Sequence, residues 1–245
     1  MKIVTVVGAR PQFVKAAAIS RVIRESYASK VEEILVHTGQ HYDENMSAIF
    51  FDELDIPHPK YNLEISGLSH GKMTGRMLEA VEDVLVREQP DCLLIYGDTN
   101  STLAGALAAA KLQIPVAHVE AGLRSFNMRM PEEINRLVTD SITNYFFTTS
   151  HTANEHLKSS GINDDKIYFV GNTMIDTLLK QRPNFKQPEI WKSLNLSLKS
   201  YVVMTLHRPA NVDEEYKLKA LIDEIITHSG EMPLVFPMHP RTAAI

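Results

Sequence analysis

Short apolar runs that alternate with helix-length segments constrain the fold more than any other feature of this sequence. The runs are rich in β-branched residues and begin almost at the first residue. They lie at residues 2–7, 31–37, 92–96, 116–119, 145–148, 167–170, 201–206 and 234–238. Continuous apolar strands separated by helices are typical of a parallel sheet that is covered on both faces. The sequence therefore predicts a doubly wound α/β fold.

The alternation changes near Gly171, and we place a domain boundary there. A helix-like stretch at 174–180 is followed by Pro183, Pro188 and a polar segment before the next strand. We therefore predict an N-terminal Rossmann-like domain over residues 1–170 and the start of a second Rossmann-like domain over 171–245. The second part supplies only two strands and one long helix, which is fewer than a parallel α/β domain of ordinary size contains. We expect the second domain to be incomplete within this chain.

Composition and charge argue against several classes of function. The formal net charge of the 245 residues is −5, and the 25 basic residues are scattered rather than clustered, so nucleic acid is not an expected partner. The single cysteine, Cys92, lies in an apolar run, which leaves no disulfide and no cysteine-rich zinc site. Among the ten histidines, His37 and His41 have His-x-x-x-His spacing, but His37 ends a predicted strand rather than lying on a helix, and no metal is predicted.

No feature of the sequence predicts contact with a membrane. No stretch reaches the length of about 18 uninterrupted apolar residues that a membrane-spanning helix needs. The apolar run before Gly8 is too short for a signal peptide and lacks a small-residue cleavage site. We expect a soluble, cytoplasmic protein.

Polar and glycine-rich segments follow the predicted strands, where ligands of open parallel sheets bind. These segments are Gly8-Ala9-Arg10, His37-Thr38-Gly39-Gln40-His41, Gly97-Asp98-Thr99-Asn100, Glu120-Ala121-Gly122-Leu123-Arg124, Gly171-Asn172, His207-Arg208 and His239. Each alone has a structural explanation, since glycines make turns and Asp98 is also suited to cap a helix. His118, inside a predicted strand, is expected to be a core histidine. Seven such segments on one edge predict a site.

The first of these segments is suited to a phosphate. It opens a helix whose free amides and dipole attract an anion, and Arg10 and Lys15 add two positive charges. It is not a Walker loop, because no Gly-Lys-Ser or Gly-Lys-Thr follows, and Gly8 lacks the further glycines of a dinucleotide fingerprint. The sequence therefore supports neither ATP hydrolysis nor a bound nicotinamide cofactor.

The acidic residues of the predicted edge are Asp98, Glu120 and the pair Glu132-Glu133. The pair stands in the first turn of a predicted helix, where carboxylates stabilise the helix in any case. Carboxylates beside a cationic phosphate loop are also what general acid–base chemistry on a sugar requires. Both roles remain open at this stage.

Several of these motifs, in their order and spacing, resemble one known family over essentially the whole chain. They are Gly8-Ala9-Arg10-Pro11 with Lys15, Thr38-Gly39-Gln40-His41, Gly97-Asp98-Thr99, His118-Val119-Glu120-Ala121-Gly122-Leu123-Arg124, Pro131-Glu132-Glu133-x-Asn135-Arg136, Gly171-Asn172-Thr173 and Leu206-His207-Arg208. The sequence resembles the non-hydrolysing UDP-N-acetylglucosamine 2-epimerases. The two longest motifs are highly specific, whereas Gly-Asn-Thr alone is weak.

The resemblance implies a glycosyltransferase-B-like pair of Rossmann-type domains and a homodimer. It implies interconversion of UDP-GlcNAc and UDP-ManNAc through elimination and re-addition of UDP, with 2-acetamidoglucal as the intermediate and no cofactor. The implied catalytic residues are Asp98, Glu120, Glu132 and His207. The implied substrate-binding residues are Arg10, Lys15, Gln40, His41 and Arg208. The Asp-Ser-Gly-Gly segment that holds uridine diphosphate in such enzymes is not among these residues.

Two departures from the family pattern leave the substrate open. Tyr42-Asp43 follows Gln40-His41, where many members have a further glutamine, and Pro209-Ala210-Asn211 stands where many have an arginine and a glutamate. These departures favour a branch that includes epimerases of UDP-2,3-diacetamido-2,3-dideoxyglucuronic acid. The sequence is also compatible with a hydrolysing relative, with a glycosyltransferase of the same architecture, and with a non-catalytic protein that retains only the first lobe.

Overall fold

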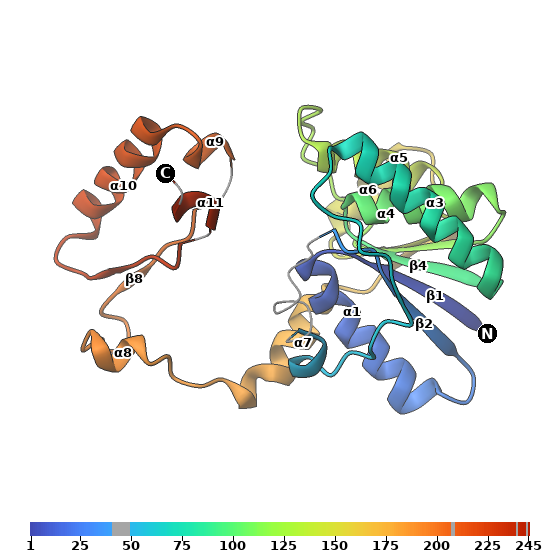
Figure 1. Ribbon diagram of the computed structural model, residues 1–245, viewed down its shortest axis with the longest axis horizontal. Coiled ribbons are helices and arrows are strands. Elements are labelled where there is room, and N and C mark those ends of the chain that lie inside the picture. The colour runs from blue at the N-terminus through green and yellow to red at the C-terminus, as the bar shows by residue number, and fades with distance from the viewer. Residues whose placement is uncertain (41–49, 207–208, 239, 244) are drawn as a thin grey trace. The chain divides into compact units, whose positions relative to one another are not determined.

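The computed structural model describes all residues of the chain except 41–49, 207–208, 239 and 244 (Figure 1). It divides into two compact units, Met1–Pro183 and Asn184–Ile245, which are described separately. Within the described residues, no helix is both long and apolar enough to cross a membrane.

The first unit is built on a seven-stranded sheet in the order β3-β2-β1-β4-β5-β6-β7. Its strands are β1 (Lys2–Val7), β2 (Glu32–His37), β3 (Tyr61–Asn62), β4 (Cys92–Tyr96), β5 (Val116–Val119), β6 (Tyr145–Thr148) and β7 (Ile167–Phe169). All neighbouring pairs are parallel, which confirms the predicted α/β sheet. The two-residue strand β3 was not predicted, because two residues show no periodicity. The strand order reverses between β1 and β4, so this is the switch point beside which ligands bind in such sheets.

The helices of the first unit cover both faces of the sheet. They are α1 (Arg10–Val22), which continues into a π-helical turn (Ile23–Tyr27), α3 (His70–Glu88), α4 (Asn100–Lys111), α5 (Pro131–Ser141), α6 (His151–Ser159) and α7 (Thr173–Gln181). Figure 1 shows α3, α4 and α5 on one face and α1 with α7 on the other. The predicted doubly wound arrangement is thus confirmed for this unit.

Alternate residues of the central strands enter two separate cores. Val6 and Ile95 belong to the core under α3 and α4. Val7 and Leu94 pack on the opposite face with Phe13 of α1. Burying a side chain of this size contributes about 1.5–3 kcal/mol. Because both faces are covered by helices, the strands need apolar residues at every position, which explains the continuous runs in the sequence.

The second unit contains a parallel pair of short strands, β8 (Val202–Val203) and β9 (Leu234–Val235). Its helices are α8 (Ile190–Ser193), α9 (Pro209–Val212), α10 (Glu215–Ser229) and α11 (Pro240–Ala243). Both strands fall within predicted runs but are shorter than those runs. The units divide after Pro183 rather than after residue 170. The physical reason is that α7 packs on α1, where the Thr177 hydroxyl donates a 2.8 Å hydrogen bond to the Val14 carbonyl.

A partly buried carboxyl group on β2 makes the stability of the first unit depend on pH. Glu33 accepts a 2.6 Å hydrogen bond from the Thr5 hydroxyl. Burial raises the pKa of Glu33, although hydrogen bonding opposes this effect. The folded protein therefore holds this proton more tightly than the unfolded chain does. The contribution of protonated Glu33 to the stability of the fold is complete below the pKa that Glu33 has in the unfolded chain. It is lost as the pH rises through the higher pKa that Glu33 has in the folded protein.

We expect Glu33→Gln to remove this dependence, because glutamine keeps a hydrogen-bond acceptor for Thr5 and has no charge to bury. The free energy of unfolding would be measured by denaturant titration at several pH values between about 4 and 7. The variant should gain stability relative to wild type as the pH rises across this range. A constant difference between the two proteins over the range would contradict the role given to Glu33.

Candidate active site

The carboxyl ends of β1, β2, β4 and β5 bring four of the predicted segments to one edge of the sheet. Val7 pairs with His37, Val6 pairs with Ile95, and Tyr96 pairs with Val119, so these strands end side by side. The segments that follow lie at 8–10, 38–40, 97–99 and 120–124. Parallel pairing therefore assembles residues that are more than 100 positions apart in the sequence.

The side chain of Gln12 ties the first of these segments to the end of β4. Its Oε1 accepts hydrogen bonds from the Gly8 and Ala9 amides at 2.7 and 3.0 Å. Its Nε2 donates to the Tyr96 carbonyl at 2.8 Å and to Thr102 Oγ1 at 3.0 Å. The expectation of free amides in this loop is thus wrong for Gly8 and Ala9, because Gln12 occupies both.

Gly8 stands where no side chain fits. A Cβ atom there would lie 2.1 Å from Thr38 Oγ1 and 2.2 Å from Ser101 Oγ. These two hydroxyls are 2.7 Å apart and share a hydrogen bond. Gln40 Oε1 accepts from the Ser101 amide at 3.2 Å and from its hydroxyl at 3.0 Å. The structure thus places the Gln40 side chain at the N-terminus of α4, where its carbonyl satisfies a first-turn amide.

Lys15 and Glu120 form a partly buried ion pair at the switch point. The distance between Lys15 Nζ and Glu120 Oε2 is 2.6 Å, and the two side chains are 7% and 18% exposed. A Cβ atom on Gly97 would lie 3.1 Å from Lys15 Nζ, so the lysine contacts the turn that leads into Asp98. Arg10 is exposed, and its guanidinium lies 5.9 Å from the centre of the Phe50 ring.

Asp98 lies among the other candidate carboxylates and two cations. It pairs with Arg136 through one carboxylate oxygen. Burial raises the pKa of Asp98; Arg136 and Lys15 oppose this effect, and Glu120 and Glu132 add to it. The three carboxylates predicted as an acid–base group are therefore close enough to influence one another. A carboxylate with a raised pKa is better matched to proton transfer near neutral pH than an ordinary aspartate is.

The adjacent residues Glu132 and Glu133 have different environments. Glu133 is 1% exposed and accepts hydrogen bonds from the Ser125 amide at 2.8 Å and the Phe126 amide at 3.1 Å. Arg136 Nη2 donates to the same carboxylate at 2.8 Å. Burial alone would raise the pKa of Glu133, but these donors outweigh it and lower the pKa to about 2. Glu133 thus holds the loop before α5, whereas Glu132 is exposed at the helix N-terminus.

His118 is buried, as expected of a core histidine, but both of its ring nitrogens have polar partners. Nδ1 lies 2.8 Å from Asp140 Oδ1, and Nε2 lies 2.7 Å from the Gly97 carbonyl oxygen. Asp140 also accepts from the Gly122 amide at 3.1 Å and from Arg124 Nη1 at 2.6 Å. This network links the turn before Asp98 to the turn after Glu120.

Three predicted site residues, His41, His207 and Arg208, lie outside the described residues.

Arg136 and Asn135 belong to the site edge, although the sequence did not single them out for a role. The Asn135 amide donates to the Asp98 carbonyl oxygen at 2.8 Å and to Asn100 Oδ1 at 3.3 Å. The sequence motif Pro-Glu-Glu-x-Asn-Arg could have indicated them. In that motif Asn135 and Arg136 follow Glu132 by three and four residues, which places them on the same face of a helix.

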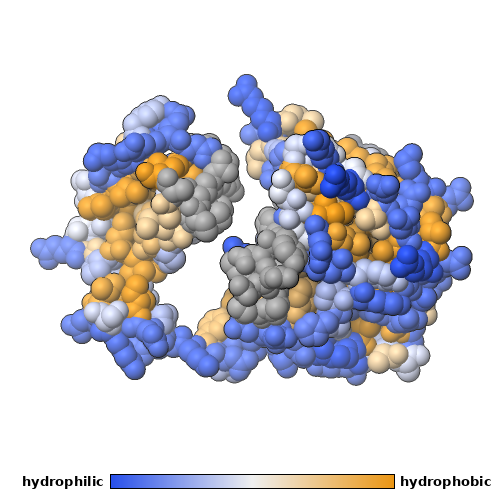
Figure 2. Space-filling model, in the orientation of Figure 1, coloured by the Kyte–Doolittle hydropathy of each residue, from blue (hydrophilic) through white to orange (hydrophobic). Residues whose placement is uncertain are grey.

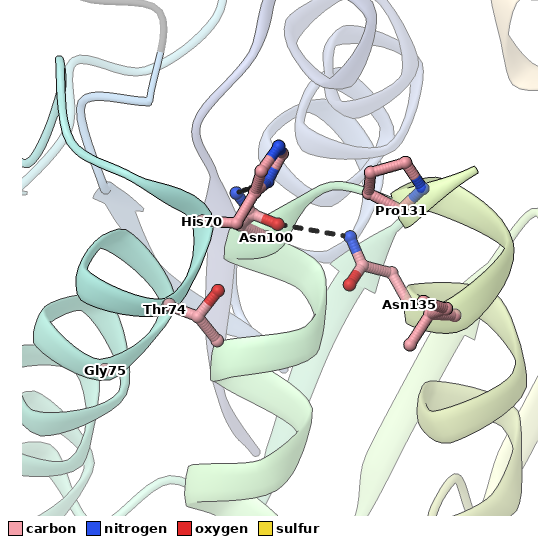
Figure 3. A pocket seen from close by; sticks show the side chains of 8 residues that line it. His70, Thr74, Gly75, Asn100, Pro131 and Asn135 are labelled. Atoms are coloured by element: carbon pink, nitrogen blue, oxygen red, sulfur yellow. Dashed lines mark hydrogen bonds between the residues drawn. The ribbon is translucent and has the colours of Figure 1, made fainter. Parts of the chain in front are cut away.

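A cavity of about 380 Å³ lies between the N-terminal parts of α3, α4 and α5 (Figure 3). Its lining residues are His70, Gly71, Thr74, Gly75, Asn100, Pro131, Ile134 and Asn135. On the face of the first unit that Figure 2 shows, hydrophilic residues predominate and apolar residues form separate patches. Within the described residues no cluster of His, Cys, Asp and Glu is arranged to hold a metal ion.

Comparisons with known proteins identify the family of the chain. The family model described as UDP-N-acetylglucosamine 2-epimerase matches residues 24–245. The chain belongs to this family. Its members are UDP-sugar 2-epimerases, as the resemblance of the sequence implied.

Two relatives from the family show what share of a family member's length this chain covers. A UDP-N-acetylglucosamine 2-epimerase homolog from Methanococcus maripaludis is 52% identical, with the match covering 99% of this chain and 66% of the relative. UDP-2,3-diacetamido-2,3-dideoxy-D-glucuronate 2-epimerase from Pseudomonas aeruginosa is 48% identical, with 100% and 68% covered. The chain thus spans about two thirds of the length of these relatives.

A solved structure of the family has the same fold. It is the crystal structure of the Methanocaldococcus jannaschii UDP-GlcNAc 2-epimerase in complex with UDP-GlcNAc and UDP. The TM-score is 0.88 at 43% sequence identity, and the match covers 100% of this chain and 67% of that one. This match confirms the glycosyltransferase-B-like epimerase fold that the motifs implied.

We expect Gly8→Ala to destabilise the protein, because the new methyl group would separate the Thr38 and Ser101 hydroxyls. Leaving such buried groups without partners costs about 1–3 kcal/mol. Gly105→Ala in α4 is the matched control, since its Cβ would meet ordinary contacts at 3.5 Å. Thermal unfolding of both variants would test this difference. Equal stability of the two variants would show that the contact around Gly8 is not restrictive.

Proposed function

We propose that the intact protein inverts carbon-2 of a UDP-linked 2-acetamido sugar and interconverts UDP-GlcNAc and UDP-ManNAc. The observation that carries this proposal is the group of Asp98, Glu120 and Glu132 beside Lys15 and Arg136 at the switch point. The family of the chain and the ligands named for the M. jannaschii structure support the choice of a UDP-sugar.

The chemistry of the sugar explains why several carboxylates are needed. The proton on carbon-2 has no neighbouring carbonyl to acidify it, so direct removal is not feasible. We propose that a carboxylate removes this proton while the bond between carbon-1 and the UDP oxygen breaks. The electron pair of the broken C–H bond forms the carbon-1–carbon-2 double bond of 2-acetamidoglucal, and UDP leaves with the electrons of its own bond.

The second half of the proposed reaction reverses these steps, except that the proton approaches the other face of carbon-2. A proton is delivered to carbon-2 from the opposite side, and the UDP oxygen adds again to carbon-1. The atoms balance without any oxidant or cofactor. Asp98, Glu120 and Glu132 are the proposed acid–base group, together with His207. Arg10 and Lys15 are proposed to stabilise the negative charge of the departing diphosphate, with Gln40, His41 and Arg208 also binding the substrate.

A second candidate substrate is UDP-2,3-diacetamido-2,3-dideoxyglucuronate. What supports it is the identity of 48% to the P. aeruginosa enzyme of that name, whereas the UDP-N-acetylglucosamine 2-epimerase homolog from M. maripaludis is 52% identical. Incubation of the intact protein with each UDP-sugar, followed by NMR of the carbon-2 proton, distinguishes the two candidates. Inversion of the uronate alone would exclude UDP-GlcNAc as the substrate. A requirement for an acceptor molecule would instead indicate a glycosyltransferase.

The family resemblance also supports two proposals about the state of the protein. We propose that it acts as a homodimer in the cytoplasm. Sedimentation analysis of the intact protein would test the first proposal, since a monomer at concentrations that give full activity would contradict it.

We expect Asp98→Asn to lower kcat by at least about a hundredfold, which is typical for the loss of a general acid or base. The control is Asp83→Asn, the same substitution at an exposed position of α3. Reactions run in D₂O would follow incorporation of deuterium at carbon-2 of the product, which the elimination route requires. Near-normal turnover of Asp98→Asn, with its fold intact by circular dichroism, would remove Asp98 from the proposed mechanism.

A further inference from the structure

The cavity lies where three helices begin, and one of its lining residues, Asn135, donates a hydrogen bond to the Asp98 carbonyl oxygen. His70 is the first residue of α3, Asn100 the first of α4 and Pro131 the first of α5. Figure 3 shows His70 and Thr74 on one side of the cavity and Pro131 and Asn135 on the other, with Asn100 between them. The cavity therefore opens next to the N-termini that also carry Asp98 and Glu132 to the site.

Two glycines of α3 leave this cavity open. Gly71 and Gly75 are four residues apart and therefore lie on the same face of the helix. A Cβ atom at either position would have no heavy atom within 4 Å. Packing thus does not require a glycine at either place, while glycine within a helix destabilises it relative to alanine. Because neither glycine has a side chain, the cavity beside them has room for a group of a ligand.

The remaining lining residues combine an apolar surface with neutral hydrogen-bonding groups. Pro131 and Ile134 provide the apolar part. Asn100 Nδ2 lies 3.3 Å from His70 Nδ1, and the Asn135 amide reaches both Asn100 and the Asp98 carbonyl oxygen. None of the eight lining side chains is a carboxylate, a lysine or an arginine. This lining matches a small neutral group that has a methyl end and an amide end.

We propose that the cavity is a specificity subsite for an acylamino group of the sugar. The inference rests on the proposed function, because it assumes that the sugar lies against Asp98. The acylamino group at carbon-2 is one source of this chemistry, and a second acylamino group at carbon-3 is the other. The hydrogen bond from Asn135 to the Asp98 carbonyl links occupation of the cavity to the position of a candidate catalytic carboxylate.

The test fills the cavity without disturbing the fold. Gly75→Leu adds a side chain into space that the protein leaves open, and it replaces a poor helix former by a good one, so its melting temperature should rise. Glu79→Leu is the matched control, one turn further along the same helix and outside the cavity lining. Calorimetry on the intact protein would measure the affinity for UDP-glucose, for UDP-GlcNAc and for a UDP-sugar with acylamino groups at carbon-2 and carbon-3.

We expect Gly75→Leu to weaken binding of the acylamino sugars by at least about tenfold, the order of effect of a misfit in an apolar pocket. UDP-glucose, which has no acylamino group, should bind to the variant and to wild type equally. Weaker binding of UDP-GlcNAc would assign the carbon-2 group to the cavity. A loss confined to the doubly substituted sugar would assign the carbon-3 group.

Two results would overturn the subsite. One is equal affinity of Gly75→Leu and wild type for all three UDP-sugars, and the other is an equal loss for UDP-glucose. Because affinity is measured separately from turnover, these results are distinct from failure of the proposed function. That failure would appear as binding of the UDP-sugars by wild type without inversion at carbon-2.

Discussion

The hydrogen bonds of one buried histidine hold together the two turns that carry the candidate carboxylates. His118 on β5 is fully buried, with Asp140 at one ring nitrogen and the Gly97 carbonyl at the other. Asp140 in turn accepts from the Gly122 amide. A buried polar network with all of its partners in place rigidifies its surroundings. The turn before Asp98 and the turn after Glu120 are therefore fixed relative to each other before any ligand arrives.

The charges of the site depend on this fixed geometry. Carboxylates brought close together oppose one another's ionisation, so cations have to lie among them. Arg136 meets this need with both ends of its planar guanidinium, since Nη1 reaches Asp98 while Nε and Nη2 reach Glu133. Because the pKa of Glu133 is lowered to about 2, this anchor is ionised at neutral pH. Glu133 thus supports the site through Arg136 without itself being exposed in it.

Local patterns in the sequence were sufficient to predict the sheet and the edge at which the site lies. The continuous apolar runs required burial on both faces, and the polar segments after them had to meet because parallel strands end together. Contacts across long sequence distances could not be predicted in this way. Gln12 occupies the Gly8 and Ala9 amides only because Tyr96, 84 residues away, lies beside them in the sheet.

The different roles of Glu132 and Glu133 show a second limit of sequence reasoning. Both glutamates suit the first turn of a helix, and the sequence offers no reason to separate them. The rotation of α5 against the preceding loop decides which carboxylate receives the Ser125 and Phe126 amides. The same limit applies to the domain boundary, because the packing of α7 on α1, which extends the first unit to Pro183, joins segments far apart in the sequence.

Backbone strain at Glu120 connects the stability of the fold to the candidate chemistry. Glu120 has a φ angle of +73°, a conformation that costs a residue other than glycine about 1–3 kcal/mol. Glycine would adopt it freely, but it would leave the Lys15 ammonium, 7% exposed, without its partner. The hydrogen bond from the Glu120 amide to the Phe147 carbonyl, at 2.9 Å, and the ion pair with Lys15 together hold the strained conformation. The strain is therefore the cost of directing a carboxylate, rather than a backbone turn alone, toward Lys15 and Asp98.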